Sequence, residues 1–261
     1  MRYLDRLPDD YTPQTEGSSN LYADALSELA KPYPSVKLDS FPILNTFISG
    51  FRPREFTILC GATGTGKTTL LSNFSASWIE QKVQHYVASV ETGHLDFIKR
   101  VISCLDGKNH NTGEPVPLDE LKRLHLIHGD KFSSSYLRMS LYDDRTPVEK
   151  LISDIYYEIK NHGCKIAMID NLNFFLEVTT NQNAILELDR VIHELVIFCK
   201  QVDIHIIMVA HPKKTDNTRV NSEFDIKGSS TAVQEAHNIL LFNRPGQDLL
   251  NHHHEEVSRM D

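Results

Sequence analysis

A run of glycines and small polar residues, closed by a lysine and a threonine, is the part of this chain best suited to chemistry. It fits the pattern G-x-x-x-x-G-K-[ST], in which glycines let several backbone N–H groups turn toward one anion. The lysine adds a positive charge for the outer phosphates of a nucleotide, and the last hydroxyl can ligate Mg²⁺. The sequence therefore predicts a site for ATP or another NTP, with Mg²⁺, formed by Gly61, Ala62, Thr63, Gly64, Thr65, Gly66, Lys67, Thr68 and Thr69.

The residues on either side of this loop supply the elements that must position it. Residues 56–60 form a short apolar run that reads as a buried strand. After the loop, Leu70, Phe74 and Trp78 recur at the spacing of one helix face. A strand, a glycine loop and a helix are the context that the pattern requires, and the helix directs its positive end at the phosphates.

Three other apolar runs end in residues able to act on a nucleotide. Asp170 follows the run 165–169 and, in the form of a Walker B segment, is expected to hold Mg²⁺ beside Thr68. Glu91 follows 84–90 and is either a general base for water or a solvated acid at a strand end. His211 follows 204–210 and is either a γ-phosphate sensor or a solvated histidine. Ligands of parallel sheets bind at such strand ends.

A polar loop continues from His211 to about Ser230, and its beginning is basic. It carries Lys213, Lys214 and Arg219 in a chain that is acidic overall. Such a loop can bind the backbone of a nucleic acid and move with the nucleotide state, or it can simply be solvated.

The bulk properties restrict the class of protein. The 261 residues are enough for one large α/β domain. The net charge of −8 means that no global basic field points to a nucleic acid partner. No apolar run approaches the length of a membrane span, and the acidic N-terminus does not resemble a targeting peptide. The four cysteines lack metal-site spacing, so we expect reduced thiols, a cytoplasmic location and no membrane partner.

Strand and helix patterns alternate along most of the chain, which predicts a mostly parallel twisted sheet with helices on both faces. The expected organisation is an arm with a linker helix at 1–37, one α/β domain at 38–244 and a tail at 245–261. Within the arm, the helix is expected at 21–31. The expected strands are 56–60, 84–90, 124–128, 137–142, 165–169, 204–210 and 238–242, and the expected helices are 68–80, 94–105, 147–161 and 185–201.

Taken in order, these segments resemble the RecA-like motor domain of hexameric replicative DNA helicases, the group of the DnaB type, the phage primase–helicases and Twinkle. The glycine loop alone is shared by many P-loop NTPases, whereas the ordered set is far more specific. The similar segments are 41–55, 61–68, 89–91, 168–172, 209–214 and 225–238.

The resemblance implies ATP hydrolysis coupled to translocation on single-stranded DNA and to duplex unwinding in replication. It implies that Glu91 is the catalytic base, acting with Lys67, and that His211 is the γ-phosphate sensor. It further implies a homo-oligomer, a hexameric ring in which the helix at 21–31 docks on the next subunit, with primase or other replisome proteins as partners and a bacterial, phage or mitochondrial source. The implied DNA contacts are Lys213, Lys214, Arg219 and Lys227.

One part of the family pattern is not visible. The family completes its ATP site with an arginine finger from a neighbour, on a strand beyond the equivalent of Arg244, but residues 245–261 show no such strand. Either 245–261 is a truncation point or the finger is lost, in which case hydrolysis is slowed by about 10³–10⁵-fold. The alternatives are a recombinase or signalling ATPase of the same fold that does not unwind DNA, and a nucleotide-binding switch.

Overall fold

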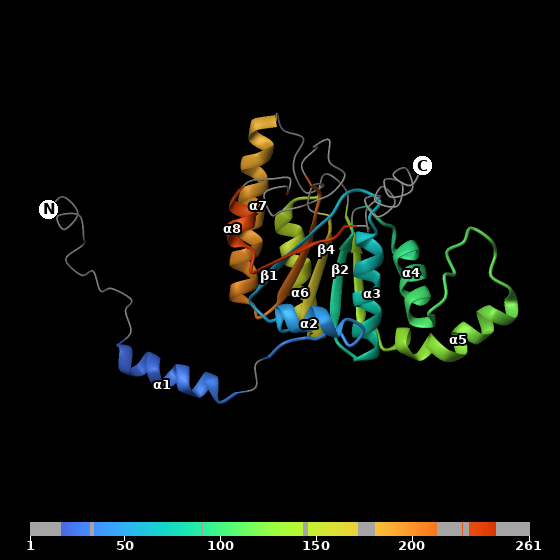
Figure 1. The fold of residues 1–261 in the computed structure, drawn as a ribbon, viewed down its shortest axis with the longest axis horizontal. Helices are drawn as coiled ribbons and strands as arrows, with labels where there is room; N and C mark the ends of the chain where they lie inside the picture. The colour runs from blue at the N-terminus through green and yellow to red at the C-terminus, as the bar shows by residue number, and fades with distance from the viewer. Residues whose placement is uncertain are drawn as a thin grey trace, which may run out of the picture. The chain divides into compact units, whose positions relative to one another are not determined.

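Strands that are buried on both faces organise the fold (Figure 1). The computed structural model describes residues 17–31, 34–89, 91–142, 146–171, 181–212, 226 and 230–243. The chain divides into two units, Met1–Pro34 and Ser35–Asp261, and the first contributes helix α1 (Ser18–Leu29). The second contains one six-stranded sheet in which every pair of neighbours is parallel, in the order β3-β2-β4-β5-β1-β6.

The parallel sheet confirms the predicted fold class, and its connections follow the alternation of the sequence. The strands are β1 (Phe56–Cys60), β2 (His85–Ser89), β3 (Leu137–Leu141), β4 (Ile166–Asp170), β5 (His205–Ala210) and β6 (Asn238–Leu241). The helices of this unit are α2 (Pro42–Ile48), α3 (Lys67–Glu80), α4 (His94–Asp106), α5 (Leu118–Ser133), α6 (Val148–His162), α7 (Asn181–Gln201) and α8 (Ser230–Glu235).

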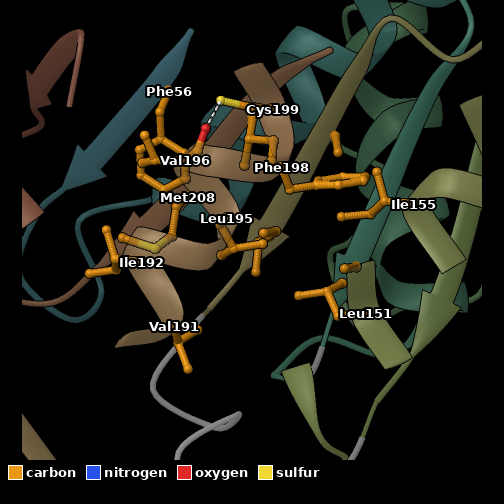
Figure 2. Packing of buried hydrophobic residues seen from close by; sticks show 14 of the residues in the cluster. Phe56, Leu151, Ile155, Val191, Ile192, Leu195, Val196, Phe198, Cys199 and Met208 are labelled. Carbon is orange, nitrogen blue, oxygen red and sulfur yellow. Dashed lines mark hydrogen bonds between the residues drawn. The ribbon is translucent and has the colours of Figure 1, made fainter. Parts of the chain in front are cut away.

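Successive residues of a central strand enter two different cores, because side chains alternate across a sheet. In β1, Ile58 packs in the core covered by α6 and α7, and Leu59 packs in the core covered by α3 and α4. Figure 2 shows the first core, where residues of α7 such as Leu195 meet Met208 of β5 and Ile155 of α6. Because helices cover both faces, a ligand can reach the sheet only at the ends of its strands.

One predicted strand is wrong. Residues 124–128 lie inside α5, which begins after Pro117. The five residues Leu-His-Leu-Ile-His are too few to distinguish a strand from a helix, and here the helical signals around them prevail. Asp119 and Glu120 in the first turn and Lys131 in the last turn complement the helix dipole. Leu126 is 85% exposed, so the run does not enter the sheet core.

Two short helices were not predicted, α2 and α8, because neither is long enough to show a helical period. The four cysteines are free, as expected, and three of them are buried. Within the described part of the chain, no helix combines the length and the apolar character needed to cross a membrane.

Two buried histidines, His85 and His205, begin β2 and β5, the strands on either side of β4. The His85 Nδ1–H donates to the Val83 carbonyl at 2.9 Å, and its Nε2 lies 2.7 Å from the Ser75 hydroxyl. The His205 Nδ1–H donates to the Arg52 carbonyl at 2.7 Å, and its Nε2 lies 2.8 Å from the Thr57 hydroxyl. Since a carbonyl only accepts, each neutral ring carries its proton on Nδ1. Burial lowers the pKa of each imidazole to about 4.

These histidines predict a loss of stability in mild acid. An unfolded histidine has a pKa of about 6.5, so between pH 6.5 and 4 the unfolded chain binds more protons, and stability falls as the pH falls. At pH 5 each ring should cost about 2 kcal/mol relative to pH 7. Urea unfolding at the two pH values measures this. We expect His85→Gln and His205→Gln each to remove part of the pH-dependent loss, while exposed His125→Gln retains all of it. An unchanged loss in the double variant would contradict the assignment.

Candidate nucleotide-phosphate site

The glycine loop lies between β1 and α3, where its glycines meet two different demands. Gly66 is the N-terminal cap of α3 and has a φ of 103°, a conformation that a side chain disfavours. At Gly61 the constraint is space, because a Cβ there would lie 2.4 Å from the carbonyl oxygen of Phe242 after β6. The glycine loop therefore packs directly against Phe242, the residue that follows β6.

Lys67 is folded back onto the loop that precedes it. Its Nζ donates to the carbonyl oxygens of Gly61 at 2.7 Å and Ala62 at 3.0 Å, and the residue is buried. Burial lowers the pKa of this ammonium, whereas the Asp170 and Glu91 carboxylates oppose that shift. A buried cation held by two neutral carbonyls, at the N-terminus of a helix, is well placed to exchange them for phosphate oxygens.

The first turn of α3 is tied to the end of β4. The Thr68 hydroxyl donates to Asp170 Oδ2 at 2.8 Å, and Asp170 is 2% exposed. Burial raises the pKa of this carboxyl and Glu91 acts in the same direction, while the Thr68 hydrogen bond and Lys67 lower it. A hydroxyl and a carboxylate are hard oxygen donors of the kind that Mg²⁺ prefers, so this pair fits that ion.

Asn171 joins the other two predicted strand-end residues. Its Nδ2 lies 3.0 Å from Glu91 Oε2 and 2.9 Å from His211 Nε2. Because an amide nitrogen only donates, His211 Nε2 accepts in this arrangement, and its ring is neutral with the proton on Nδ1. The turn after β2 that carries Glu91 is fixed by Ser89, whose hydroxyl donates to the Thr92 carbonyl at 2.7 Å. Glu91 keeps 47% of its side chain exposed and can meet a water molecule.

Arg100 approaches the site from α4. Its Nη1 donates to the Thr69 hydroxyl at 3.3 Å, directly after the glycine loop. Its Nε is buried and has no hydrogen-bond partner among the described residues. Its charge also lowers the pKa of Asp170, against the larger effect of burial. Arg100 therefore brings a third positive group, besides Lys67 and the helix terminus, to one small region.

The structure brings together five residues singled out in the sequence: Lys67, Thr68, Glu91, Asp170 and His211. The predicted nucleic-acid contacts lie outside the described residues; they are Lys213, Lys214, Arg219 and Lys227. Sequence reasoning missed two members of the site. Asn171 had one signal, its place directly after Asp170. Arg100 had none, because it stands nine residues after Glu91 in the middle of an amphipathic helix.

Comparison with known proteins agrees with this geometry. A family model described as an AAA domain, AAA_25, matches residues 35–217. Among solved structures, one described as an "ATPase Domain" superposes with a TM-score of 0.68 at 17% identity, over 87% of this chain and 83% of that one.

A second similar structure is that of a "DnaB-Like Replicative Helicase" described with its interactions with primase. The TM-score is 0.68 at 18% identity, over 90% of this chain and 58% of that chain, so this chain spans less than two thirds of it. At these identities the likeness establishes the fold. The chain therefore belongs to the AAA_25 family of AAA domains, with the RecA-like fold of helicase ATPase domains.

Proposed function

We propose that this protein is an ATP-driven DNA helicase motor of the DnaB and Twinkle type, which couples ATP hydrolysis to translocation on single-stranded DNA and to duplex unwinding in replication. The observation that carries the proposal is the Glu91–Asn171–His211 bridge beside the Thr68–Asp170 pair. A nucleotide-binding site alone requires the loop, Lys67 and Thr68. A carboxylate and a histidine joined through one amide supply what hydrolysis and its sensing need in addition.

The residues take the following roles in this proposal. The phosphates lie on the loop N–H groups, and Lys67 exchanges the Gly61 and Ala62 carbonyls for phosphate oxygens. Thr68 and Asp170 hold Mg²⁺, which neutralises charge on the phosphates. Glu91 takes the proton of the attacking water, and Asn171 keeps its carboxylate turned inward.

His211 reports the γ-phosphate through the same amide. When its ring turns toward a phosphate oxygen, the Asn171 contact of 2.9 Å lengthens or breaks, and we expect this change to reach residues 213 onward. The basic loop predicted there then moves with the nucleotide state. In the family, an arginine from a neighbouring subunit completes the site. Because the sequence of residues 245–261 shows no strand of that kind, we assign this role to no residue of this chain.

The first functional prediction concerns the rate of ATP hydrolysis in two variants. Lys67→Ala should lower the ATPase rate by at least about 10²-fold, because it removes a fixed charge at the phosphates. Glu91→Gln should lower kcat by about 10²–10⁴-fold while nucleotide still binds, because only the base is lost. ATP turnover and fluorescent-nucleotide binding measure the two effects. The control is Asp96→Asn, an exposed carboxylate in the first turn of α4. Full activity in Lys67→Ala would refute the site.

Assays on the same proteins distinguish a helicase from the two alternative functions. A helicase should hydrolyse ATP faster with single-stranded DNA and displace a strand from a forked substrate. A recombinase or signalling ATPase should hydrolyse without displacement. A nucleotide-binding switch should bind ATP with no DNA-stimulated turnover.

The basic loop gives the second functional prediction. Lys213→Ala combined with Lys214→Ala should weaken binding to single-stranded DNA and make log K against log salt shallower by about 1.4, since two phosphate contacts are lost. Fluorescence anisotropy at several salt concentrations measures the slope. Lys160→Ala with Lys165→Ala is the matched control, because these exposed lysines flank the amino end of β4. If both pairs behave alike, the loop does not contact DNA.

Assembly into a ring is supported by the exposed apolar side of α1. Leu21, Tyr22 and Leu29 are 50%, 67% and 81% exposed. We expect a mass near six times the 29.8 kDa of one chain in light scattering with ATP and Mg²⁺. Leu26→Asp with Leu29→Asp should reduce that mass, whereas Ser27→Asp on the opposite side of the helix should not. A monomer under all conditions would exclude the ring.

A further inference from the structure

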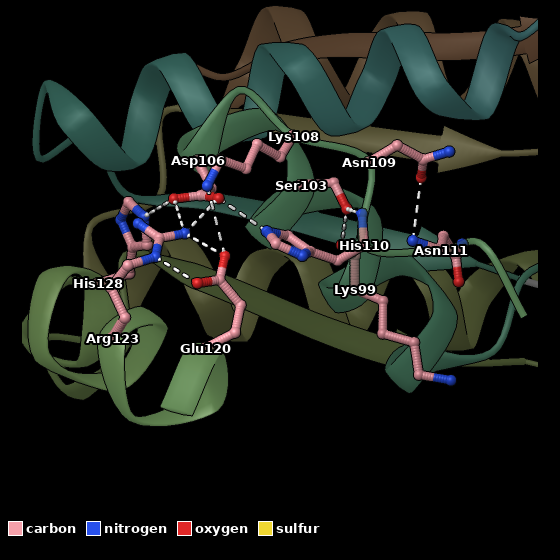
Figure 3. A network of polar contacts seen from close by, with 10 residues as sticks. All are labelled: Lys99, Ser103, Asp106, Lys108, Asn109, His110, Asn111, Glu120, Arg123 and His128. Atoms are coloured by element: carbon pink, nitrogen blue, oxygen red, sulfur yellow. Dashed lines mark hydrogen bonds and ion pairs between the residues drawn. The ribbon is translucent and has the colours of Figure 1, made fainter. Parts of the chain in front are cut away.

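A second cluster of ligand-type side chains lies away from the phosphate site, where α4 meets α5 (Figure 3). Asp106 is the last residue of α4, and Glu120 and His128 lie on α5. His110 stands in the connection between the two helices. One ligand atom each from Asp106, His110 and Glu120 can be chosen so that all three lie within 4.8 Å of one another.

The Asp106 carboxylate is the centre of the cluster. It receives His110 Nε2 at 2.7 Å and Arg123 Nη2 at 2.6 and 2.7 Å. Arg123 also donates to Glu120, through Nε and Nη2, each at 2.7 Å. Hydrogen bonds from Arg123 are the main reason why the pKa of both carboxyls is well below the usual range. The same contacts hold the two carboxylates close together, with oxygens of both turned toward Arg123.

His128 brings a second imidazole to the cluster, and this one is buried. Its side chain is 6% exposed, and Nε2 points into the cluster but lies 3.5 Å from Asp106 Oδ1, a long contact for a hydrogen bond. Its Nδ1 has no partner among the residues that the structure describes. A buried imidazole is normally hydrogen-bonded at least once with good geometry. The contact from Nε2 to Asp106 is long, so this nitrogen is the one that could turn to an ion held by the carboxylates.

We propose that Asp106, His110, Glu120 and His128 form a Zn²⁺ site that fastens the end of α4 to α5. Two imidazoles and two carboxylates are a ligand set that suits Zn²⁺, whereas Mg²⁺ and Ca²⁺ take oxygen ligands. The two carboxylates carry a charge of −2, which the ion balances. No other described group of at least three histidine, cysteine or acidic side chains meets in this way.

Arg123 competes with a metal ion for the carboxylates of Asp106 and Glu120. Its guanidinium now supplies the positive charge between Asp106 and Glu120, and its side chain is 33% exposed. Lys108 makes a looser contact with Glu120 at 3.6 Å and is 63% exposed. Both cations can turn into solvent when the metal enters, so binding is an exchange of one internal cation for another. The alternative is a permanent ion-pair cluster that binds no metal.

Zinc titration of the full chain tests the proposal. All measurements use a background in which the sequence triplet His252–His254 is replaced by alanine, because adjacent histidines can bind Zn²⁺ themselves. Excess Mg²⁺ is present to occupy the phosphate site. We expect one equivalent of Zn²⁺ by calorimetry, and Co²⁺ in its place should give the visible absorption of a tetrahedral site. No binding of either ion would overturn the proposal.

Variants identify the ligands and the competitor. His110→Ala and His128→Ala should each weaken Zn²⁺ binding at least about tenfold, since even an outer-shell partner is worth that much. His125→Ala, exposed on the same helix, should leave the affinity unchanged. Arg123→Gln should tighten Zn²⁺ binding, because it removes the competing cation. A permanent ion-pair cluster predicts instead that Arg123→Gln only lowers the melting temperature, with no metal bound, and that result would reject the site.

Discussion

The hydrogen bond between Thr68 and Asp170 joins segments that are 102 residues apart in the chain, and the arrangement of the phosphate site depends on it. The two residues come from β4 and from the helix after β1, and β5 separates these strands in the sheet. The bond therefore forms only when β5 lies between them in register. It also fixes the first turn of α3, where the loop N–H groups converge. The site is in this sense a property of the whole sheet.

Burial makes this arrangement costly in the free protein. Lys67 and Asp170 are both nearly inaccessible to solvent. Burial lowers the pKa of Lys67 and raises the pKa of Asp170, and each shift favours the neutral form of the group. Charges taken out of water are tolerated only when opposite charges and hydrogen bonds offset the loss of hydration. Lys67 and Asp170 attract each other, but their direct hydrogen-bond partners are neutral, and burial outweighs the attraction in the pKa of both groups. Phosphates and Mg²⁺ would supply the missing opposite charges, which is why perturbed titratable groups of this kind mark functional sites.

The sequence predicted what local rules determine. A fixed motif identified the glycine loop, and the position of Asp170, Glu91 and His211 after apolar strands identified one edge of the sheet. Local rules do not identify a site residue that reaches the site from an element distant in the sequence. Arg100 reaches Thr69 only because α4 packs on α3, and nothing in its neighbours along the chain indicates this.

The same limit explains the Asp106 cluster and the wrong strand at 124–128. The spacings from Asp106 to His110, Glu120 and His128 match no short metal motif, and the cluster exists only because the connection after α4 turns back against α5. Once α5 is recognised as a helix, Glu120, Arg123 and His128 fall on one side of it. Read as a strand, that segment would have placed His128 in a sheet and hidden the cluster.

Helix α4 gives the two polar clusters a common support. Arg100 and Asp106 lie six residues apart, about 9 Å along the axis of one helix. Arg100 also lines a pocket of about 550 Å³, together with Thr69 and Asn73 of α3 and residues of the connection to Asn111. Arg100 contacts Thr69 beside the glycine loop, and Asp106 contacts Arg123 of α5. The two polar clusters are thus carried by the middle and the end of one helix.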